Sequence, residues 1–179
     1  PIHTLPQVLS DQPLYGHPVL SRACRPVTVF DDELGRLVAD MFATMYAAEG
    51  VGLAANQIGV DARVFVVDCP DASGRHTVAH VVNPVLEEPT DRELVTEPEG
   101  CLSVPGAYGD LARLATVAVQ GVDRHGDPVR LVGPVFLRGA SSTRSHLDGI
   151  VYVDRLSRRE RSRRLEEVRQ PAYPTLARP

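Results

Sequence analysis

Features typical of membrane, secreted and nucleic-acid-binding proteins are missing from this sequence of 179 residues. No apolar run approaches the roughly 20 residues that a membrane-spanning helix needs, so we expect no membrane span. The three cysteines, Cys24, Cys69 and Cys101, are spaced too widely for a disulfide framework, and the N-terminus lacks the basic-then-apolar pattern of a secretory signal. We therefore expect a cytoplasmic protein.

Lysine is absent: all 19 basic residues are arginine, which indicates codon bias. The formal net charge of -4 argues against a general nucleic-acid binder. A local basic run, "RLSRRERSRR" from Arg155 to Arg164, is more typical of a solvated helix face than of a binding patch. We do not expect nucleic acid to be a partner, and the sequence gives no indication of the oligomeric state.

Length and patterning predict one α+β domain over residues 1–170. A chain of this size can bury about two thirds of its unfolded surface in a single core. Residues 1–30 are rich in proline and in short apolar pieces, which predicts an extended arm that wraps the domain. Residues 171–179 are again rich in proline, and we expect this tail to be disordered.

Hydrophobic periodicity predicts the main elements of this domain. Apolar residues recur at helical spacing from Leu34 to Tyr46, with Asp31 or Asp32 able to cap the start of a helix and Gly50 to end it. Runs of β-branched residues over 62–68, 77–89 and 116–132 predict antiparallel strands, and the last run contains a hairpin signal at residues 125–126. Further helices are expected around residues 136–147 and over residues 155–169.

Two short segments contain residues that can carry chemistry. "GVGLAANQIGV", residues 50–60, combines small residues, which let a backbone approach a ligand, with the amide of Gln57, which can donate to a developing oxyanion. Alone, this segment is more typical of a tight turn into a strand. "EGCLSVPG", residues 99–106, places Cys101 after Gly100, but a lone cysteine is more often a small buried apolar residue than a nucleophile or ligand.

Taken together, three ordered segments resemble the motifs of the peptide deformylases. These are "GVGLAANQ", "EGCLS" about forty-five residues later, and "HLDGIVYVDRL" after a similar interval. The resemblance extends from "GHPVLSRACRPV" in the arm to "DRL" and so covers most of the chain. It implies a peptide-deformylase-like fold, with antiparallel strands packed around a central helix.

The resemblance also implies a metallohydrolase that removes the formyl group from the N-terminal methionine of new polypeptides. In that family a Cys and the two His of a helical HExxH motif bind iron or zinc, and the Glu of the motif is the general acid/base. Two His at positions i and i+4 share one face of a helix, which is why this spacing can bind a metal. A Gln and the backbone N–H after the Cys stabilise the oxyanion.

Matching residue by residue transfers several of these roles to the present chain. Gln57 matches the oxyanion Gln, and the N–H of Leu102 matches the second oxyanion donor. Cys101 matches the Cys ligand, and His146 matches the second His of the helical motif. The resemblance further implies a set of substrate-binding residues, which are Gly50, Val51, Gly52, Glu99 and Gly100.

Two positions of the helical motif do not match. Counting back from His146, the first His falls on Ser142 and the Glu falls on Thr143. No His, Glu or Asp occurs between Gly133 and Ser145, so a slip of one residue does not restore the motif. We therefore expect a divergent member with an incomplete metal site and with metal-dependent deformylation impaired or lost, because a catalytic zinc site usually has three protein ligands.

The main hypothesis for the function keeps catalysis and discards the metal, so no cofactor is expected. Two ligands of one tetrahedral ion lie roughly 3.5 Å apart, which would leave Cys101 and His146 within reach of each other as a Cys-His dyad. An imidazole beside a thiol lowers the pKa of the thiol and yields a thiolate nucleophile. Such a dyad would catalyse acyl transfer, formyl transfer or amide hydrolysis.

Two alternatives stay open. In the first, iron or zinc is kept through a replacement ligand, which is water or one of His3, His17, His76, His80 and His125. The missing Glu would still cost a general base that is typically worth roughly 10²–10⁴ in rate. In the second, the chain is a non-catalytic binding module. All three hypotheses share the same expected partner, a small N-acylated amino acid or peptide.

Overall fold

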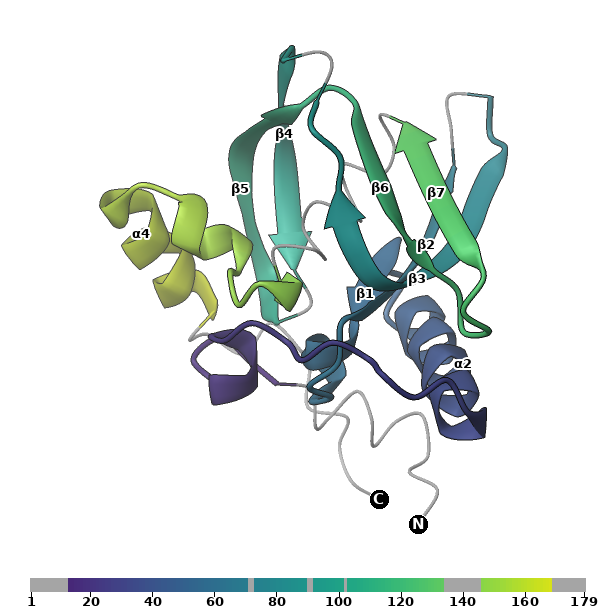
Figure 1. Cartoon of the computed structure of the whole chain (residues 1–179). Coiled ribbons are helices and arrows are strands. Elements are labelled where there is room, and N and C mark those ends of the chain that lie inside the picture. The colour runs from purple at the N-terminus through teal and green to yellow at the C-terminus, as the bar shows by residue number, and fades with distance from the viewer. Residues whose placement is uncertain (1–12, 71–72, 90–91, 102, 134–145, 169–179) are drawn as a thin grey trace.

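A computed structural model describes residues 13–70, 73–89, 92–101, 103–133 and 146–168 (Figure 1). Within them, helices and strands occur in the following order: η1 (Pro18–Leu20), α2 (Asp32–Ala47), β1 (Gly52–Ala54), η2 (Ala55–Ile58), β2 (Val64–Pro70), β3 (His76–Leu86), β4 (Leu94–Cys101), β5 (Val104–Leu114), β6 (Val117–Val122), β7 (Pro128–Gly133), η4 (Tyr152–Arg155) and α4 (Arg158–Val168). The predicted α+β class is confirmed.

The first predicted helix is confirmed as α2. Asp31 caps it, because the carboxylate oxygen Oδ1 accepts the backbone N–H of Glu33 at 3.0 Å and that of Leu34 at 3.1 Å. The helix ends at Ala47 rather than at Gly50, whose N–H donates back to the carbonyl of Met45. The face that α2 buries carries Leu34, Val38, Met41 and Met45.

The strands form two antiparallel sheets. The larger sheet has the order β1-β2-β3-β6-β7, and β4 and β5 form a separate two-stranded sheet. The predicted hairpin is confirmed, since β6 and β7 pair antiparallel around residues 123–127. The predicted polar helix near the C-terminal end is confirmed as α4. Of the helix expected over residues 136–147, only residues 146–147 lie within the described part, and they are helical.

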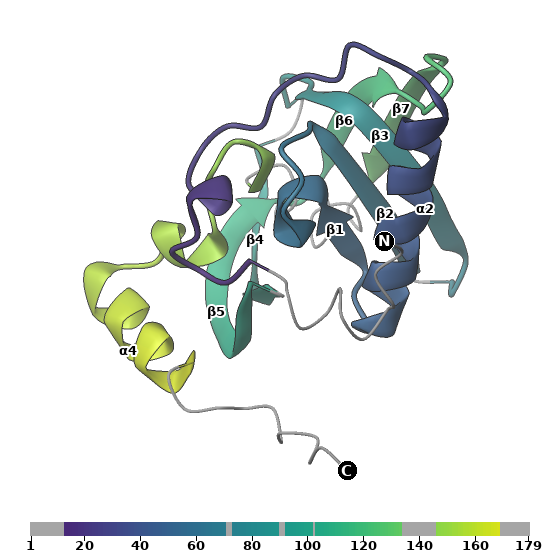
Figure 2. The ribbon, with the colours of Figure 1, turned by 90° about the horizontal axis from the view of Figure 1, so that it is seen from below.

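Strand β2 is buried on both faces and lies at the centre of the domain. Val64 and Val66 pack with α2 in one apolar cluster, whereas Phe65 and Val67 belong to a second cluster that includes Leu147. This division follows from the alternation of side chains along a strand. Figures 1 and 2 show α2 lying along the larger sheet. The residue after His146 is thus buried against the face of β2 that α2 does not cover.

A third apolar cluster joins the two-stranded sheet to segments from both ends of the described chain. It contains Val19 and Leu20 of η1, Val104 and Leu111 of β5, and Tyr152, Val153 and Leu156 at or beside η4. Cys101, the last residue of β4, packs against this cluster. The end of β4 is therefore held in place by apolar contacts from chain segments far apart in sequence.

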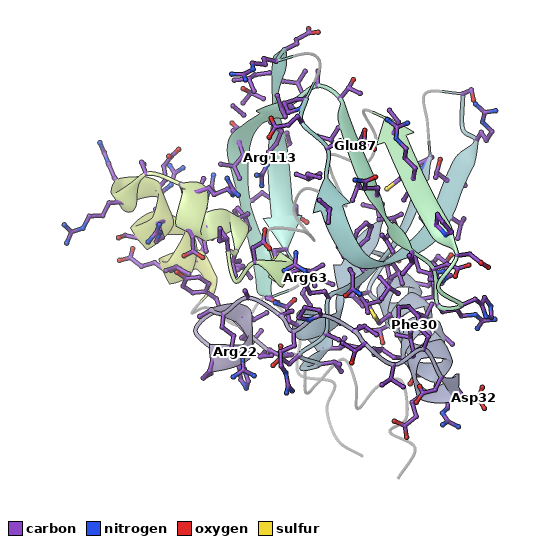
Figure 3. The ribbon with its side chains drawn as sticks, viewed as in Figure 1. Arg22, Phe30, Asp32, Arg63, Glu87 and Arg113 are labelled. Carbon is purple, nitrogen blue, oxygen red and sulfur yellow. The ribbon has the colours of Figure 1, made fainter. Side chains whose placement is uncertain are left out.

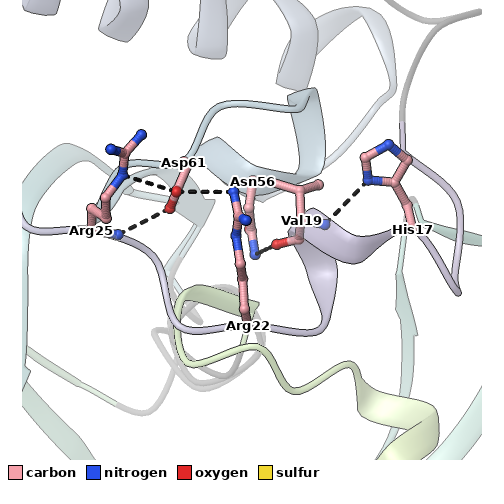
Figure 4. Close-up of polar contacts among 6 residues, drawn as sticks. All are labelled: His17, Val19, Arg22, Arg25, Asn56 and Asp61. Carbon is pink, nitrogen blue, oxygen red and sulfur yellow. Dashed lines mark hydrogen bonds and ion pairs between the residues drawn. The ribbon is translucent and has the colours of Figure 1, made fainter.

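The described part of the N-terminal arm, residues 13–30, runs across the domain and is tied to it by polar contacts (Figure 4). Arg22 and Arg25 both pair with Asp61 at 3.0 Å. Further along, the amide of Asn83 exchanges two hydrogen bonds of 2.8 Å with the backbone of Val27. Exposed ion pairs contribute little individually, so the backbone contacts hold the arm more strongly.

Some expectations concern residues that the structure does not describe. Residues 1–12 of the predicted arm and the predicted disordered tail, 171–179, lie outside the described residues. In the described part, no helix is long and apolar enough to cross a membrane. The cytoplasmic location stays a prediction.

The backbone of Arg22 in the arm lies close to Gly149, which predicts that Gly149 is sensitive to substitution. A Cβ atom at this position would lie 2.6 Å from the backbone N and C of Arg22, and Gly149 has a φ of +77°. Gly126 is a matched control, because it has a φ of +87° and nothing within 4 Å of such a Cβ. We expect Gly149→Ala to lower the free energy of unfolding by about 1–3 kcal/mol more than Gly126→Ala, because the left-handed strain is common to both. Urea denaturation measures this difference. Equal losses of unfolding free energy in the two variants would show that the contact between Gly149 and Arg22 is not tight enough to exclude a Cβ atom.

Candidate functional site

Three segments that are distant in sequence converge on the sulfur of Cys101. The Sγ atom of Cys101 lies 3.0 Å from Nε2 of His146 and 3.5 Å from Nε2 of Gln57. Cys101 ends β4, Gln57 belongs to η2, and His146 begins the last described stretch of the chain. Gln57 and His146 are 4% and 1% exposed, so these polar groups meet in the interior.

Local hydrogen bonds orient the groups around this sulfur. The side-chain oxygen of Gln57 accepts the N–H of Ala54 at 2.8 Å, which directs its NH₂ group toward Cys101. The backbone N–H of Ser103 also donates to the sulfur, at 3.3 Å. Cys101 as a whole is partly exposed, but its sulfur faces these inward donors. The site therefore offers N–H donors beside the thiol.

Burial controls the protonation of the central pair. It raises the pKa of Cys101 to about 11, although hydrogen bonds from Ser103, Val104 and Gln57 act in the opposite direction. Burial also lowers the pKa of His146 to about 4. At neutral pH the pair consists of a thiol and an uncharged imidazole.

Comparison of this chain with known proteins identifies its family. Residues 13–162 match the family described as polypeptide deformylase. The chain belongs to this family. A peptide deformylase 1 of Streptomyces avermitilis is 49% identical over 167 residues, which cover 90% of this chain and 77% of that protein. A second one from the same organism, peptide deformylase 2, is 54% identical over 145 residues, or 80% of this chain and 77% of that protein.

Solved deformylase structures share the fold. The crystal structure of the peptide deformylase from Ehrlichia chaffeensis has a TM-score of 0.83 and 29% identity, and the match covers 93% of this chain and 98% of that one. The structure from Legionella pneumophila has a TM-score of 0.80 and 35% identity, with 89% and 92% covered. The expected deformylase fold is therefore confirmed.

One sequence-based expectation about this site, an activated thiolate at Cys101, is not supported. The dyad hypothesis requires the pKa of the Cys101 thiol to be lowered by His146, but burial raises it. A thiolate–imidazolium pair would place two charges in a poorly solvated site, and the surrounding N–H donors do not compensate for the lost solvation. Burial therefore favours the neutral pair in the metal-free protein.

The same pair suits a divalent metal better than a free nucleophile. An uncharged imidazole is the form of His that binds a metal, and a bound cation deprotonates a thiol outright. The 3.0 Å contact is somewhat shorter than the roughly 3.5 Å between two ligands of one tetrahedral ion, so a small separation of the two side chains would admit the ion. Nδ1 of His146 is buried and has no hydrogen-bond partner within the described residues. The donor chemistry of Cys101 and His146 thus fits iron or zinc, and the expectation of no cofactor finds no support here.

A third protein ligand is not found within the described residues, which contain no group of three His, Cys, Asp or Glu side chains able to hold a metal. Four of the proposed replacement ligands lie in other environments. Nδ1 of His17 accepts the N–H of Val19, His76 pairs with Asp68, and both His80 and His125 accept hydrogen bonds from Arg124. None of these four joins Cys101 and His146, and His3 lies outside the described residues.

The remaining predicted site residues are only partly described. Gly50, Val51 and Gly52 lead through β1 into η2, and Val51 is 43% exposed. Gly100 pairs with Tyr108 of β5 and lies under its ring, since a Cβ on Gly100 would be 2.6 Å from that ring. Leu102 and the side chain of Glu99 lie outside the description, so their roles stay predictions.

Sequence reasoning missed three residues that hold the segment beginning at His146. Asn56, directly before Gln57, donates from Nδ2 to the carbonyl of His146 at 2.6 Å. Arg63, whose side chain is labelled in Figure 3, donates to the carbonyl of Leu147 and to the carboxylate of Asp148. The backbone N–H of Cys24 also donates to Leu147, at 2.8 Å. Of these three residues, only Asn56 was indicated by the sequence, as the amide next to Gln57 in "GLAANQ".

The pKa of Cys101 predicts how this thiol reacts in metal-free protein. A rise from 9.0 to about 11 reduces the thiolate fraction at pH 7 by about 100-fold, because each pKa unit is a factor of ten. We expect iodoacetamide to modify Cys101 as slowly as the buried Cys24, whose pKa burial also raises to about 11. Mass spectrometry after brief treatment, with urea-unfolded protein as the control in which all cysteines react, measures this. Rapid modification of Cys101 and not of Cys24 would instead support the hypothesis that Cys101 and His146 form a catalytic dyad.

Proposed function

We propose that this chain is a metal-dependent hydrolase of N-formylated peptides whose metal is held by two protein ligands, Cys101 and His146. The observation that carries the proposal is the buried 3.0 Å contact between a thiol and an uncharged imidazole, with the Gln57 amide 3.5 Å from the same sulfur. The names of the relatives support the substrate class, since they are called peptide deformylases. One related structure, from Ehrlichia chaffeensis, is a complex with actinonin.

Each residue of the site has a distinct role in this reaction. The oxygen of water adds to the formyl carbon, the carbon–nitrogen bond breaks, the amine takes a proton, and formate leaves. Gln57 donates from Nε2 to the oxyanion that develops on the formyl oxygen, and the N–H of Ala54 holds its amide in that orientation. Iron or zinc, when bound, supplies a Lewis acid that polarises the carbonyl and makes water more acidic.

The reaction is expected to be slow because the matched position of the general base is Thr143. A hydroxyl group cannot accept and return a proton at neutral pH as a carboxylate does, and such a base is worth roughly 10²–10⁴ in rate. Affinity for the metal is also expected to be reduced, because two protein ligands replace three. The proposed chain is therefore a deformylase with weakened metal binding and weakened proton transfer.

Metal binding and formate release test this proposal together. We expect Zn²⁺ or Fe²⁺ to bind with one site per chain, and the loaded protein to release formate from a formyl-methionyl peptide at least about 100-fold more slowly than a deformylase with an intact HExxH motif. Cys101→Ala and His146→Ala should abolish metal binding and activity together. Gln57→Leu should keep the metal but lower kcat by roughly 10²–10³, since it removes one oxyanion donor.

Cys24→Ala is the matched control, because Cys24 is a buried cysteine in an apolar cluster and its backbone contact to Leu147 survives the change. It should retain both metal and activity. Formate release that persists in excess chelator and disappears on alkylation of Cys101 would support the thiol nucleophile instead. Peptide binding without any formate release, with or without metal, would leave a non-catalytic binding module.

Descent from a deformylase with the complete motif is compatible with the codons that the sequence allows. The four residues Ser141, Ser142, Thr143 and Arg144 can be encoded by the codons TCC, AGC, ACG and AGG, in that order. Read from the third nucleotide, these codons contain CAG, CAC and GAG, which encode Gln, His and Glu. The absence of lysine indicates a bias against A-rich codons, which agrees with serine and threonine codons ending in C or G. We infer that the HExxH motif was lost through two compensating frameshifts, one before Ser141 and one between Arg144 and His146.

The gene sequence tests this inference directly. The expected codons are AGC at Ser142, ACG at Thr143, and AGA or AGG at Arg144. A codon at Ser142 that does not end in C, one at Thr143 that does not end in G, or a CGN codon at Arg144 would each remove the His-Glu pair from the shifted frame. Any of these findings would rule out this origin.

A further inference from the structure

Two adjacent amides, Asn56 and Gln57, lie in the four-residue helix η2 and are both buried. A 3₁₀-helix has three residues per turn, so neighbouring side chains leave its axis about 120° apart. The two amides accordingly reach different parts of the site. Gln57 contacts the sulfur of Cys101, and Asn56 contacts the backbone of His146.

The contact between Asn56 and His146 is short and well defined. Nδ2 of Asn56 donates to the carbonyl of His146 at 2.6 Å and lies 3.4 Å from the carbonyl of Val19, which is drawn in Figure 4. Asn56 is 0% exposed. A flipped amide would point its oxygen at two carbonyl oxygens, so the donor orientation is the favourable one. Buried acceptors need donors, and Asn56 supplies one across 90 residues of sequence.

His146 has few other restraints within the described residues. Its Nδ1 atom has no hydrogen-bond partner there, and its Nε2 atom contacts Cys101. Metal-binding histidines usually donate the second ring N–H to a fixed acceptor, which orients the ring. Here the backbone carbonyl is held instead, by Asn56 and by the N–H of Gly149 at 2.9 Å. The placement of the ring therefore depends on how firmly its own backbone is fixed.

We propose that Asn56 is a positioning residue that sets the separation between Cys101 and His146. Helix η2 contacts the cysteine through Gln57 and the histidine through Asn56, so one short rigid element spans both halves of the pair. The inference rests on the proposed function, because it assigns the pair as the metal ligands. The side-chain NH₂ group of Asn56 contacts the backbone carbonyls of His146 and Val19, so its proposed effect on the pair is indirect.

Asn56→Asp tests this role with the smallest change of shape. It replaces the donating NH₂ group with an oxygen that faces the carbonyl of His146, so the contact becomes repulsive. Asn83→Asp is the matched control. The amide of Asn83 also donates to a backbone carbonyl, that of Val27 at 2.8 Å, and aspartate tolerates its φ of +53° as asparagine does.

We expect both variants to lower the thermal midpoint, but only Asn56→Asp to change the site. It should weaken Co²⁺ binding by about tenfold or more, the effect typical of lost support to a metal-binding histidine, and shift the sulfur-to-cobalt charge-transfer band. Equal Co²⁺ affinity and identical spectra in the two variants would show that Asn56 is only structural and would overturn the proposal.

A second readout separates failure of this inference from failure of the proposed function. If the wild-type protein binds no Co²⁺, the metal-dependent function fails, and the ring ¹⁵N shifts of His146 in metal-free protein then report its contact with Cys101. We expect Asn56→Asp to move these shifts and Asn83→Asp to leave them unchanged. Unchanged shifts in both variants would refute the positioning role whether or not the protein binds a metal.

Discussion

The contact between Cys101 and His146 is the constraint on which the rest of this site depends. Neither residue can reach the other through local structure, because 45 positions separate them in sequence. One ends a strand of the small sheet, and the other begins the segment that packs under the large sheet. The two sheets must therefore be held in one relative position, and η2, the arm and the third apolar cluster all contribute to holding them.

Burial decides what this contact can do chemically. In water an imidazole and a thiol with ordinary pKa values can exchange a proton at modest cost, whereas here burial favours the uncharged form of each group. The neutral pair is poorly suited to serve as a nucleophile and its base. A bound cation would deprotonate the thiol and offset the charge of the thiolate, and an uncharged imidazole is the form of His that binds a metal.

The anchoring of residues 146–149 shows how a short chain segment can be fixed mainly through its backbone. The carbonyls of His146 and Leu147 accept hydrogen bonds from Asn56, Arg63 and the arm. Gly149 completes this arrangement, since only a residue without a Cβ fits against the backbone of Arg22. These contacts come from residues with no role in the chemistry, and they hold the one histidine that matches the family motif.

The sequence by itself determined the elements with strong periodicity and the three motifs. Helix α2, the β6–β7 hairpin and helix α4 follow from local spacing and turn residues, so they were predictable from short windows of sequence. The motifs identified Gln57, Cys101 and His146 by residue type and order. Only the tertiary structure decided the burial of the Cys101–His146 pair and the hydrogen bond from Asn56 to His146. A pKa depends on burial, and a hydrogen bond between residues 90 positions apart depends on how the segments pack, and neither quantity is encoded in local sequence.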